Sequence, residues 1–269
     1  MTSITRTDFQ FNFKKNIIVR IDFQGVLEVE MEKILMLIKP YLKDKGFSRY
    51  MRKMSNEIEI NVSNLNQQTP SFSKIQSQEV HSFVNDDKGY VLNLSSSFVC
   101  LDISSTAYAP FEDYSILVLD IADIYKSNID FVSINRVGIR KINICMVEDK
   151  KKIKEYFSSA YFGYFEAMES VDTFSSNRRD TFGIKPYKGN VSCNIDQGDA
   201  NGKILYKVSL DVDIYTDDTN TIAQGLDFNQ MNEILFRIYV DSLNDRFKRK
   251  LLGNDENVFS DIIGVEKNE

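Results

Sequence analysis

Hydrophobic and polar residues alternate along much of the chain with a period of two, which is typical of β-strands. The clearest example is the segment Ser133–Cys145 near the middle of the chain. One face of it would carry Ile134, Arg136, Gly138, Arg140, Ile142 and Ile144, and the other Asn135, Val137, Ile139, Lys141, Asn143 and Cys145. This pattern predicts a long central strand.

The same period predicts further strands at 17–24, 57–62, 80–84, 90–94, 98–103, 167–174, 190–195 and 203–215. Asp86–Gly89 lies between two of them and is typical of a hairpin turn. Apolar residues at helical spacing predict helices at 28–46, 111–125, 148–161 and 228–251, with Pro110 in a first helical turn. The polar stretch Ser63–Glu79 predicts a mobile surface loop.

These elements indicate an α+β fold made of two pseudo-repeated halves, each with a strand, a helix, three or four strands and a closing helix. Residues 1–15 would form an N-terminal arm, 16–129 the first half, 130–253 the second half, and 254–269 a poorly ordered tail. The repeat has two alternative explanations: duplication of an ancestral half, or the ordinary alternation of strands and helices in an α+β chain. If the halves match, one antiparallel sheet would carry four helices on one face, an order of elements similar to the TATA-binding-protein saddle.

The composition describes an ordinary globular protein. Its 269 residues are 42% hydrophobic and 12% aromatic, and 33 basic against 39 acidic residues leave a net charge of −6. No overall positive field therefore attracts nucleic acid or an anionic membrane. The start of the chain lacks the apolar core of a signal peptide and no apolar run is long enough for a membrane span, which predicts a cytosolic protein with no membrane partner. Three widely spaced cysteines are expected to be reduced.

Sequence motifs exclude several enzyme classes. The chain has no phosphate-binding glycine loop, no dinucleotide fingerprint, no zinc-protease motif and no serine-hydrolase elbow, and its only histidine, His81, lies on a predicted strand. We expect His81 to be structural, and we expect no cofactor. Asp211 and Asp213 at the end of a strand are weak candidates for a divalent-metal site, but acidic strand ends also serve simply to discourage strand pairing.

Arg136 and Arg140 would point the same way from the central strand, with Gly138 between them. Two guanidinium groups on one face either bind a carboxylate or phosphate from a ligand, or are held by aspartates of the same chain. The pair is therefore either a binding site or a part of the fold.

Two basic stretches are candidates for contact with nucleic acid. Arg178 and Arg179 lie in a predicted loop near Lys185 and Lys188, and Arg246, Lys248 and Arg249 end the last predicted helix. Aromatic residues at 161–165 and Tyr187 would add stacking surfaces for bases. The alternative is a solvated loop and an ordinary helix end, in which the basic residues complement the helix dipole.

The central strand resembles that of a sporadically distributed bacterial protein family without a characterised function, whose signature strand reads Arg-x-Gly-x-Arg-Tyr-x-Asn. Arg136, Gly138, Arg140 and Asn143 match this signature, and Lys141 stands where that family usually has Tyr. The resemblance implies a cytosolic bacterial protein of patchy distribution, as expected of accessory or phage-defence genes. The resemblance implies no catalytic residues in this chain.

Three functions follow as expectations. The first is a non-enzymatic interaction or assembly protein that contacts a protein partner or a second copy of itself across an exposed sheet face. The second is a nucleic-acid-binding component of a phage-defence or mobile-element system, which would use the basic stretches. The third is a metal-dependent phosphoesterase built on Asp211 and Asp213.

Overall fold

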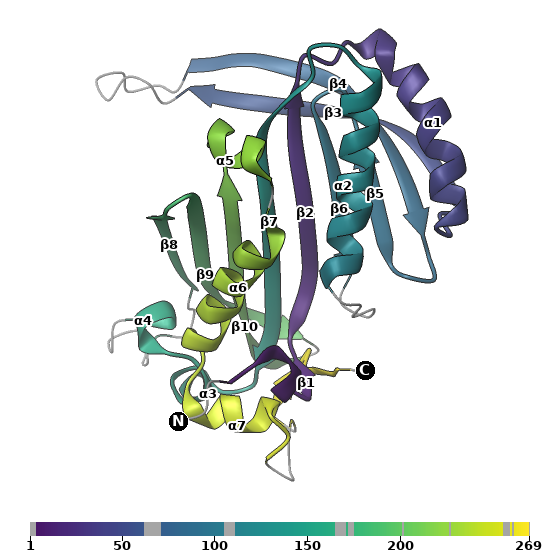
Figure 1. Cartoon of the computed structure of the whole chain (residues 1–269). Helices are drawn as coiled ribbons and strands as arrows, with labels where there is room; N and C mark the ends of the chain where they lie inside the picture. Colours follow the sequence, from purple (N-terminus) through teal and green to yellow (C-terminus); the bar gives the residue numbers. More distant parts are fainter. Residues whose placement is uncertain are drawn as a thin grey trace.

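The computed structural model of the chain describes residues 4–61, 71–104, 111–164, 171, 175–200, 202–225, 227–254, 259 and 261–268. Within these residues, seven α-helices and twelve strands form a mixed α+β fold with a large antiparallel sheet (Figure 1). The α+β class predicted from the sequence is therefore confirmed.

Nine strands form the main sheet in the order β3-β4-β5-β6-β2-β7-β10-β9-β8. Their bounds are β2 Lys14–Gln24, β3 Arg49–Asn61, β4 Ser71–Asn85, β5 Tyr90–Leu94, β6 Phe98–Ser104, β7 Ser133–Val147, β8 Ser175–Ile184, β9 Tyr187–Ala200 and β10 Lys203–Thr216. The short strand β11 (Ile262–Ile263) also pairs with β7, while β1 (Phe11–Asn12) and β12 (Glu266–Lys267) pair with each other. The hairpin of β4 and β5, with its turn before Tyr90, is confirmed.

The predicted central strand is β7, which pairs antiparallel with β2 on one side and β10 on the other. Residues on one face of these strands are fully buried, among them Val19, Ile139 and Leu210 at 0% exposure. Residues on alternate positions, such as Arg20 and Asp211, remain partly exposed. The period of two therefore divides the sheet into a buried face and a second face.

Helices cover the buried face and one end of the sheet. They are α1 (Met31–Asp44), α2 (Phe111–Asn128), α3 (Lys150–Tyr156), α4 (Ser159–Phe162), α5 (Thr219–Gln224), α6 (Phe228–Asp241) and α7 (Asp245–Leu251). In Figure 1, α2 lies over β2 and β6, and α6 lies over β7 and β10. Helices α3 and α7 pack together at one end of the sheet rather than over its middle. Each fully buried aromatic or aliphatic side chain here contributes about 1.5–3 kcal/mol to folding.

Two predicted helices are each broken in two. The segment 228–251 forms α6 and α7, and the segment 148–161 forms α3 and α4. The breaks pair with each other, because the backbone of Phe157 bridges Leu243 and the Asn244 side chain donates to the carbonyl oxygens of Lys154 (2.8 Å) and Phe157 (2.9 Å). Asn is unfavourable inside a helix because its side chain competes with helical backbone bonds, and it is favoured at a helix start, where Asn244 lies before α7.

Two predicted loops are wrong. Residues 71–79 of the predicted loop Ser63–Glu79 belong to β4, whereas 62–70 lie outside the described residues. Arg178 and Arg179 lie on β8, which pairs with β9, and not in a loop. The polar sequence of β8 is typical of an edge strand, and the residues on both of its faces are mostly exposed. Pro110 and nearly all of the predicted strand 167–174 also lie outside the described residues.

The two ends of the chain meet. The predicted arm supplies β1 and the predicted disordered tail supplies β12, and Asn268 donates from its side chain to the Phe9 carbonyl oxygen at 2.6 Å. Thus the tail is ordered from 261 to 268 and closes the same end of the sheet as α7. Across the described ranges no helix is both long and apolar enough to cross a membrane.

The boundary expected between the halves, at residues 129 and 130, falls between α2 and β7. Strands β2 and β7 nevertheless pair over most of their length, so one continuous sheet includes residues from both sides of this boundary.

Candidate ligand cavity

A cavity of about 570 Å³ lies between the N-terminal arm, α6 and the ends of β2 and β7, and we call it the arm cavity. Its size is within the range of small-molecule sites. The described residues that line it are Arg6, Thr7, Phe9, Gln10, Phe11, Asn12, Lys14, Lys141, Asn143, Val212, Leu235, Phe236, Tyr239, Lys267 and Asn268. Four of these are basic and none is acidic.

A β-bulge turns Lys14 into the arm cavity. The register between β2 and β7 shifts between Lys14 and Asn16, so Lys14 lies on the same face as buried Ile17. A bulge adds one residue to one strand and so reverses which face the following positions occupy. Lys14 is 9% exposed, and burial lowers its pKa to about 8 although Glu266 acts in the opposite direction.

Lys141 enters the arm cavity from the central strand, on the same face as Val137 and Ile139. Its ammonium donates a hydrogen bond to Oδ1 of Asn232 on α6 at 2.6 Å. Burial lowers its pKa to about 7, and the positive charges of Arg6 and Lys14 lower it further. A sizeable fraction of this amine is therefore neutral near pH 7.

Arg6 fastens the arm over the cavity. Its guanidinium donates to Glu233 Oε1 (2.6 Å) and to the Asn232 carbonyl oxygen (2.5 Å), and it stacks over the Phe236 ring at 4.9 Å. Its Nε is buried with no hydrogen-bond partner within the described part of the chain. Asn232 thus contacts both Arg6 and Lys141.

Tyr239 of α6 completes the polar lining. Its hydroxyl is buried and has no hydrogen-bond partner among the described residues, and burial raises its pKa. Its ring packs against Phe9 (5.9 Å between centroids) and Phe13 (5.3 Å). Buried polar groups without a partner are unfavourable.

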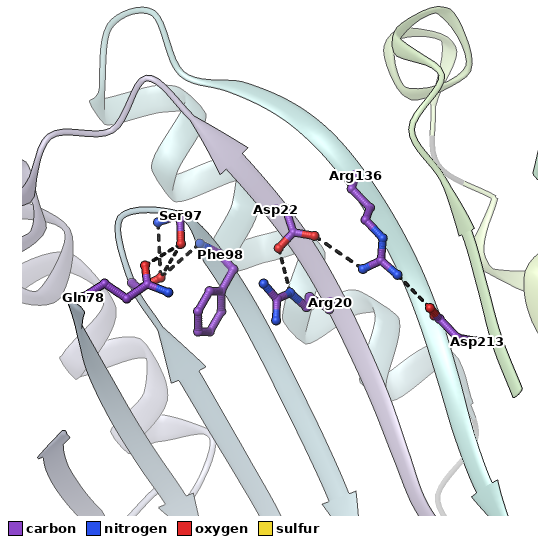
Figure 2. Close-up of polar contacts among 8 residues, drawn as sticks. Arg20, Asp22, Gln78, Ser97, Phe98, Arg136 and Asp213 are labelled. Carbon is purple, nitrogen blue, oxygen red and sulfur yellow. Dashed lines mark hydrogen bonds and ion pairs between the residues drawn. The ribbon is translucent and has the colours of Figure 1, made fainter. Parts of the chain in front are cut away.

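The sequence-predicted arginine pair lies on the other face of the sheet, turned away from α2 and α6, which we call the open face. Figure 2 shows Asp22 between Arg20 and Arg136, and Arg136 reaching on to Asp213. The distances are 2.6 Å from Arg20 to Asp22, and 3.4 Å and 2.8 Å from Arg136 to Asp22 and Asp213. Arg140 forms a two-pronged pair with Asp211 at 2.7 and 2.5 Å.

Both aspartates that we considered as metal ligands therefore face arginines. Burial raises the pKa of Asp213 above its usual value, although Arg136 and Arg140 oppose this. Asp211 raises the pKa of Arg140 through its hydrogen bond. Over the described ranges, no group of three or more His, Cys, Asp or Glu residues is arranged to hold a metal ion.

The two basic stretches lie on different elements, and each contains ion pairs. Arg178 on β8 pairs with Asp180 (2.7 Å), and Arg246 on α7 pairs with Glu155 (2.5 Å). Lys248 lies 4.0 Å from Asp245. Arg179 and Arg249 are exposed. Figure 1 shows β8 at the edge of the sheet and α7 beyond the end of the sheet. The two basic stretches therefore lie on separate elements and do not form one continuous basic surface along a single element.

His81 belongs to a second polar cluster, where α1 crosses β3 and β4. Its Nδ1 lies 2.8 Å from the Tyr50 hydroxyl and its Nε2 lies 3.2 Å from Glu79. Burial lowers the pKa of His81 despite the nearby Glu79 carboxylate. A pocket of about 520 Å³ beside it carries both acidic and basic side chains, unlike the arm cavity.

Sequence reasoning missed Lys14, Lys141 and Tyr239. One signal was available for Lys141, because it is the only charged residue on its face of the predicted central strand Ser133–Cys145. Lys14 carried no such signal, since its orientation depends on the bulge.

No family model matches this chain, and a comparison with curated proteins finds no relative. The chemistry of the arm cavity and of the open face is therefore the basis for a functional proposal.

Proposed function

We propose that this chain is a binding protein for a small organic anion, which occupies the arm cavity. The observation that carries the proposal is that buried Lys14 and partly buried Lys141 lie in a lining that has four basic and no acidic residues among those described. The protein as a whole is acidic, so this positive charge is a local feature. A carboxylate or a phosphate would offset the cost of burying these cations.

The walls of the arm cavity favour a ligand with an aromatic or aliphatic body. Phe9, Phe11 and Phe236 line it together with Leu235 and Val212. Apolar walls with a few convergent polar groups are typical of small-molecule sites. The anionic group would lie near Lys14 and Lys141, and the body of the ligand between the aromatic rings.

Calorimetric titration tests this proposal with 3-phenylpropanoate and its neutral analogue 3-phenylpropan-1-ol. We expect the acid to bind about tenfold more tightly, because charged hydrogen bonds exceed neutral ones. Lys14→Met should abolish most of this preference, and Lys53→Met, which removes an exposed lysine on β3, should not. Equal affinity of the acid and the alcohol for the wild-type protein would refute the proposal.

A second candidate, a non-enzymatic protein contact, is supported by the open face. Its arginines and aspartates are paired with one another, so the face is nearly neutral and its side chains are held in place. A second copy of the chain is the partner we would test first. Sedimentation velocity should show a dimer that Ile142→Glu disrupts, since Ile142 lies half-buried on this face. A wild-type monomer at all concentrations would exclude self-association.

Nucleic-acid binding through Arg178, Arg179, Arg246, Lys248 and Arg249 is a weaker proposal, since three of these residues already have carboxylate partners. It predicts an affinity for duplex DNA that falls steeply as salt rises, measurable by fluorescence anisotropy. A phosphoesterase would need Asp211 and Asp213 to leave their arginines, and Asp211→Asn would then abolish a divalent-dependent activity. A role in phage defence rests only on the family resemblance of the central strand.

We also infer that the two halves are related by a pseudo-twofold axis between β2 and β7, as in the TATA-binding-protein saddle. The order of pairing supports this, because β6, β5 and β4 follow β2 outward as β10, β9 and β8 follow β7. Superposition of the first half on the second is the test. Failure of β2, β6 and β5 to overlie β7, β10 and β9 would count against duplication.

A further inference from the structure

The amine of Lys141 has the surroundings of a nucleophile. It lies in the wall of the arm cavity, and it donates one hydrogen to the Asn232 side chain at 2.6 Å. No carboxylate within the described part of the chain forms an ion pair with it, whereas Arg136, Arg140 and Arg246 each pair with a carboxylate. The bond to Asn232 fixes the nitrogen and turns its lone pair away from that residue.

We propose that Lys141 captures the carbonyl group of a 2-oxo acid in the arm cavity as an imine. This inference rests on the proposed function, because the carboxylate must first bind among the basic residues. Lys14 pairs with Asn143 across the strands and is a diagonal neighbour of Lys141. Diagonal neighbours lie about 7–8 Å apart. A ligand with adjacent carboxylate and carbonyl groups fits this spacing, with Lys14 on the carboxylate and Lys141 on the carbonyl carbon.

The reaction needs no oxidant or reductant. The Lys141 nitrogen attacks the carbonyl carbon and forms a C–N bond, while a proton moves from nitrogen to the carbonyl oxygen to give a carbinolamine. Loss of water then forms the C=N bond.

Lys141 is a better nucleophile at neutral pH than Lys14, the other lysine deep in the arm cavity. Its pKa of about 7 leaves about half of the amine neutral at pH 7. For Lys14, with a pKa of about 8, that fraction is about a tenth. The amine must be neutral to attack, so we assign the covalent role to Lys141 and the electrostatic role to Lys14.

Reductive trapping tests the assignment on the full-length protein. Phenylpyruvate is added near pH 7 with sodium cyanoborohydride, which reduces the imine to a stable secondary amine, and the modified lysines are located by peptide mass spectrometry. We expect Lys141 to be labelled at least about tenfold faster than exposed Lys53, because about half of the Lys141 amine is neutral at pH 7 and Lys141 lines the arm cavity where the acid would bind. Lys14→Met, which keeps Lys141, should slow the labelling.

A parallel titration separates the two proposals. Phenyllactate has the same carboxylate and ring but no carbonyl, so it reports anion binding alone. Binding of phenyllactate together with labelling of Lys141 no faster than Lys53 would overturn the imine proposal and leave the binding function intact. Labelling that is confined to Lys141 and lost in Lys141→Arg would support it. Absence of phenyllactate binding counts against the proposed function, while the labelling ratio still decides the covalent role.

Discussion

The free energy of unfolding should rise with pH above neutrality, and replacement of Lys141 by Met should remove most of this rise. The pKa of Lys141 is about 7 in the folded protein against an ordinary value of 10.5. Between these values the unfolded chain keeps the proton and the folded chain releases it. The free energy of unfolding therefore rises with pH, by up to about 1.4 kcal/mol for each pH unit. Below the folded pKa both states are protonated, and the cost of the buried charge is present in full.

The expected magnitude follows from this linkage. From pH 7 to pH 9, Lys141 contributes about 2 kcal/mol of added stability, and Lys14 contributes about 1 kcal/mol more because its pKa is about 8. Met has a similar volume and no charge, so Lys141→Met keeps the packing. It loses only the part of the pH-dependent stability that Lys141 contributes. The lost hydrogen bond to Asn232 lowers stability by an amount that does not change with pH, and the pH slope is therefore the quantity to compare.

The assay is urea unfolding, followed by far-ultraviolet circular dichroism at about pH 7, 8 and 9 and constant ionic strength. Higher pH is avoided because burial also raises the pKa of the cysteines, whose ionisation in the unfolded state then lowers stability. The slope of Lys141→Met should be lower than that of the wild type by about 1 kcal/mol per unit. Lys53→Met, on an exposed strand position, should retain the wild-type slope. Equal slopes for wild type and Lys141→Met would refute the view that Lys141 is buried as a neutral amine.

Further predictions concern the central sheet. Gly138→Ala should destabilise the protein by about 1–3 kcal/mol in urea unfolding, because its Cβ would lie 2.9 Å from the Cβ of Tyr215. Gly198→Ala, whose Cβ would meet no atom within 4 Å, should change stability by less than about 0.5 kcal/mol. Arg136→Met should cost about 1–2 kcal/mol because it removes a partner of Asp213, and an unchanged urea midpoint would contradict this. The three cysteines should resist a thiol reagent at about pH 8 until urea is added, since burial raises the pKa of each thiol.

Local periodicity was sufficient to predict most of the sheet. The alternation in β7 and β10 was strong because one face of each strand is packed under α6, and the same alternation located β2, β5 and β6. It failed where both faces of a strand are polar, as in β8, because such a strand has the composition of a loop. It also failed at Leu243 and Asn244, where a helical pattern continues but the chain turns to pair with the break between α3 and α4.

The open face illustrates which part of a site a sequence can predict. Arg136 and Arg140 were expected on one face of one strand, since this follows from their spacing alone. Their partners lie on other strands, Asp22 on β2 and Asp213 on β10, and depend on the register between strands. Register is a long-range property, so the choice between an internal and an external partner had to come from the structure.

The arm cavity, by contrast, is a site that the sequence alone could not predict. Its lining comes from residues near 10, 141, 236 and 267, which are separated by most of the chain and meet only because β1 pairs with β12 and Arg6 reaches α6. Each basic residue alone is an ordinary surface residue by composition, and its chemistry arises from burial beside the others. Burial of Lys14 and Lys141 lowers stability at neutral pH. A ligand that neutralises them would recover this free energy, so the anion binding that we propose for the arm cavity would also stabilise the fold.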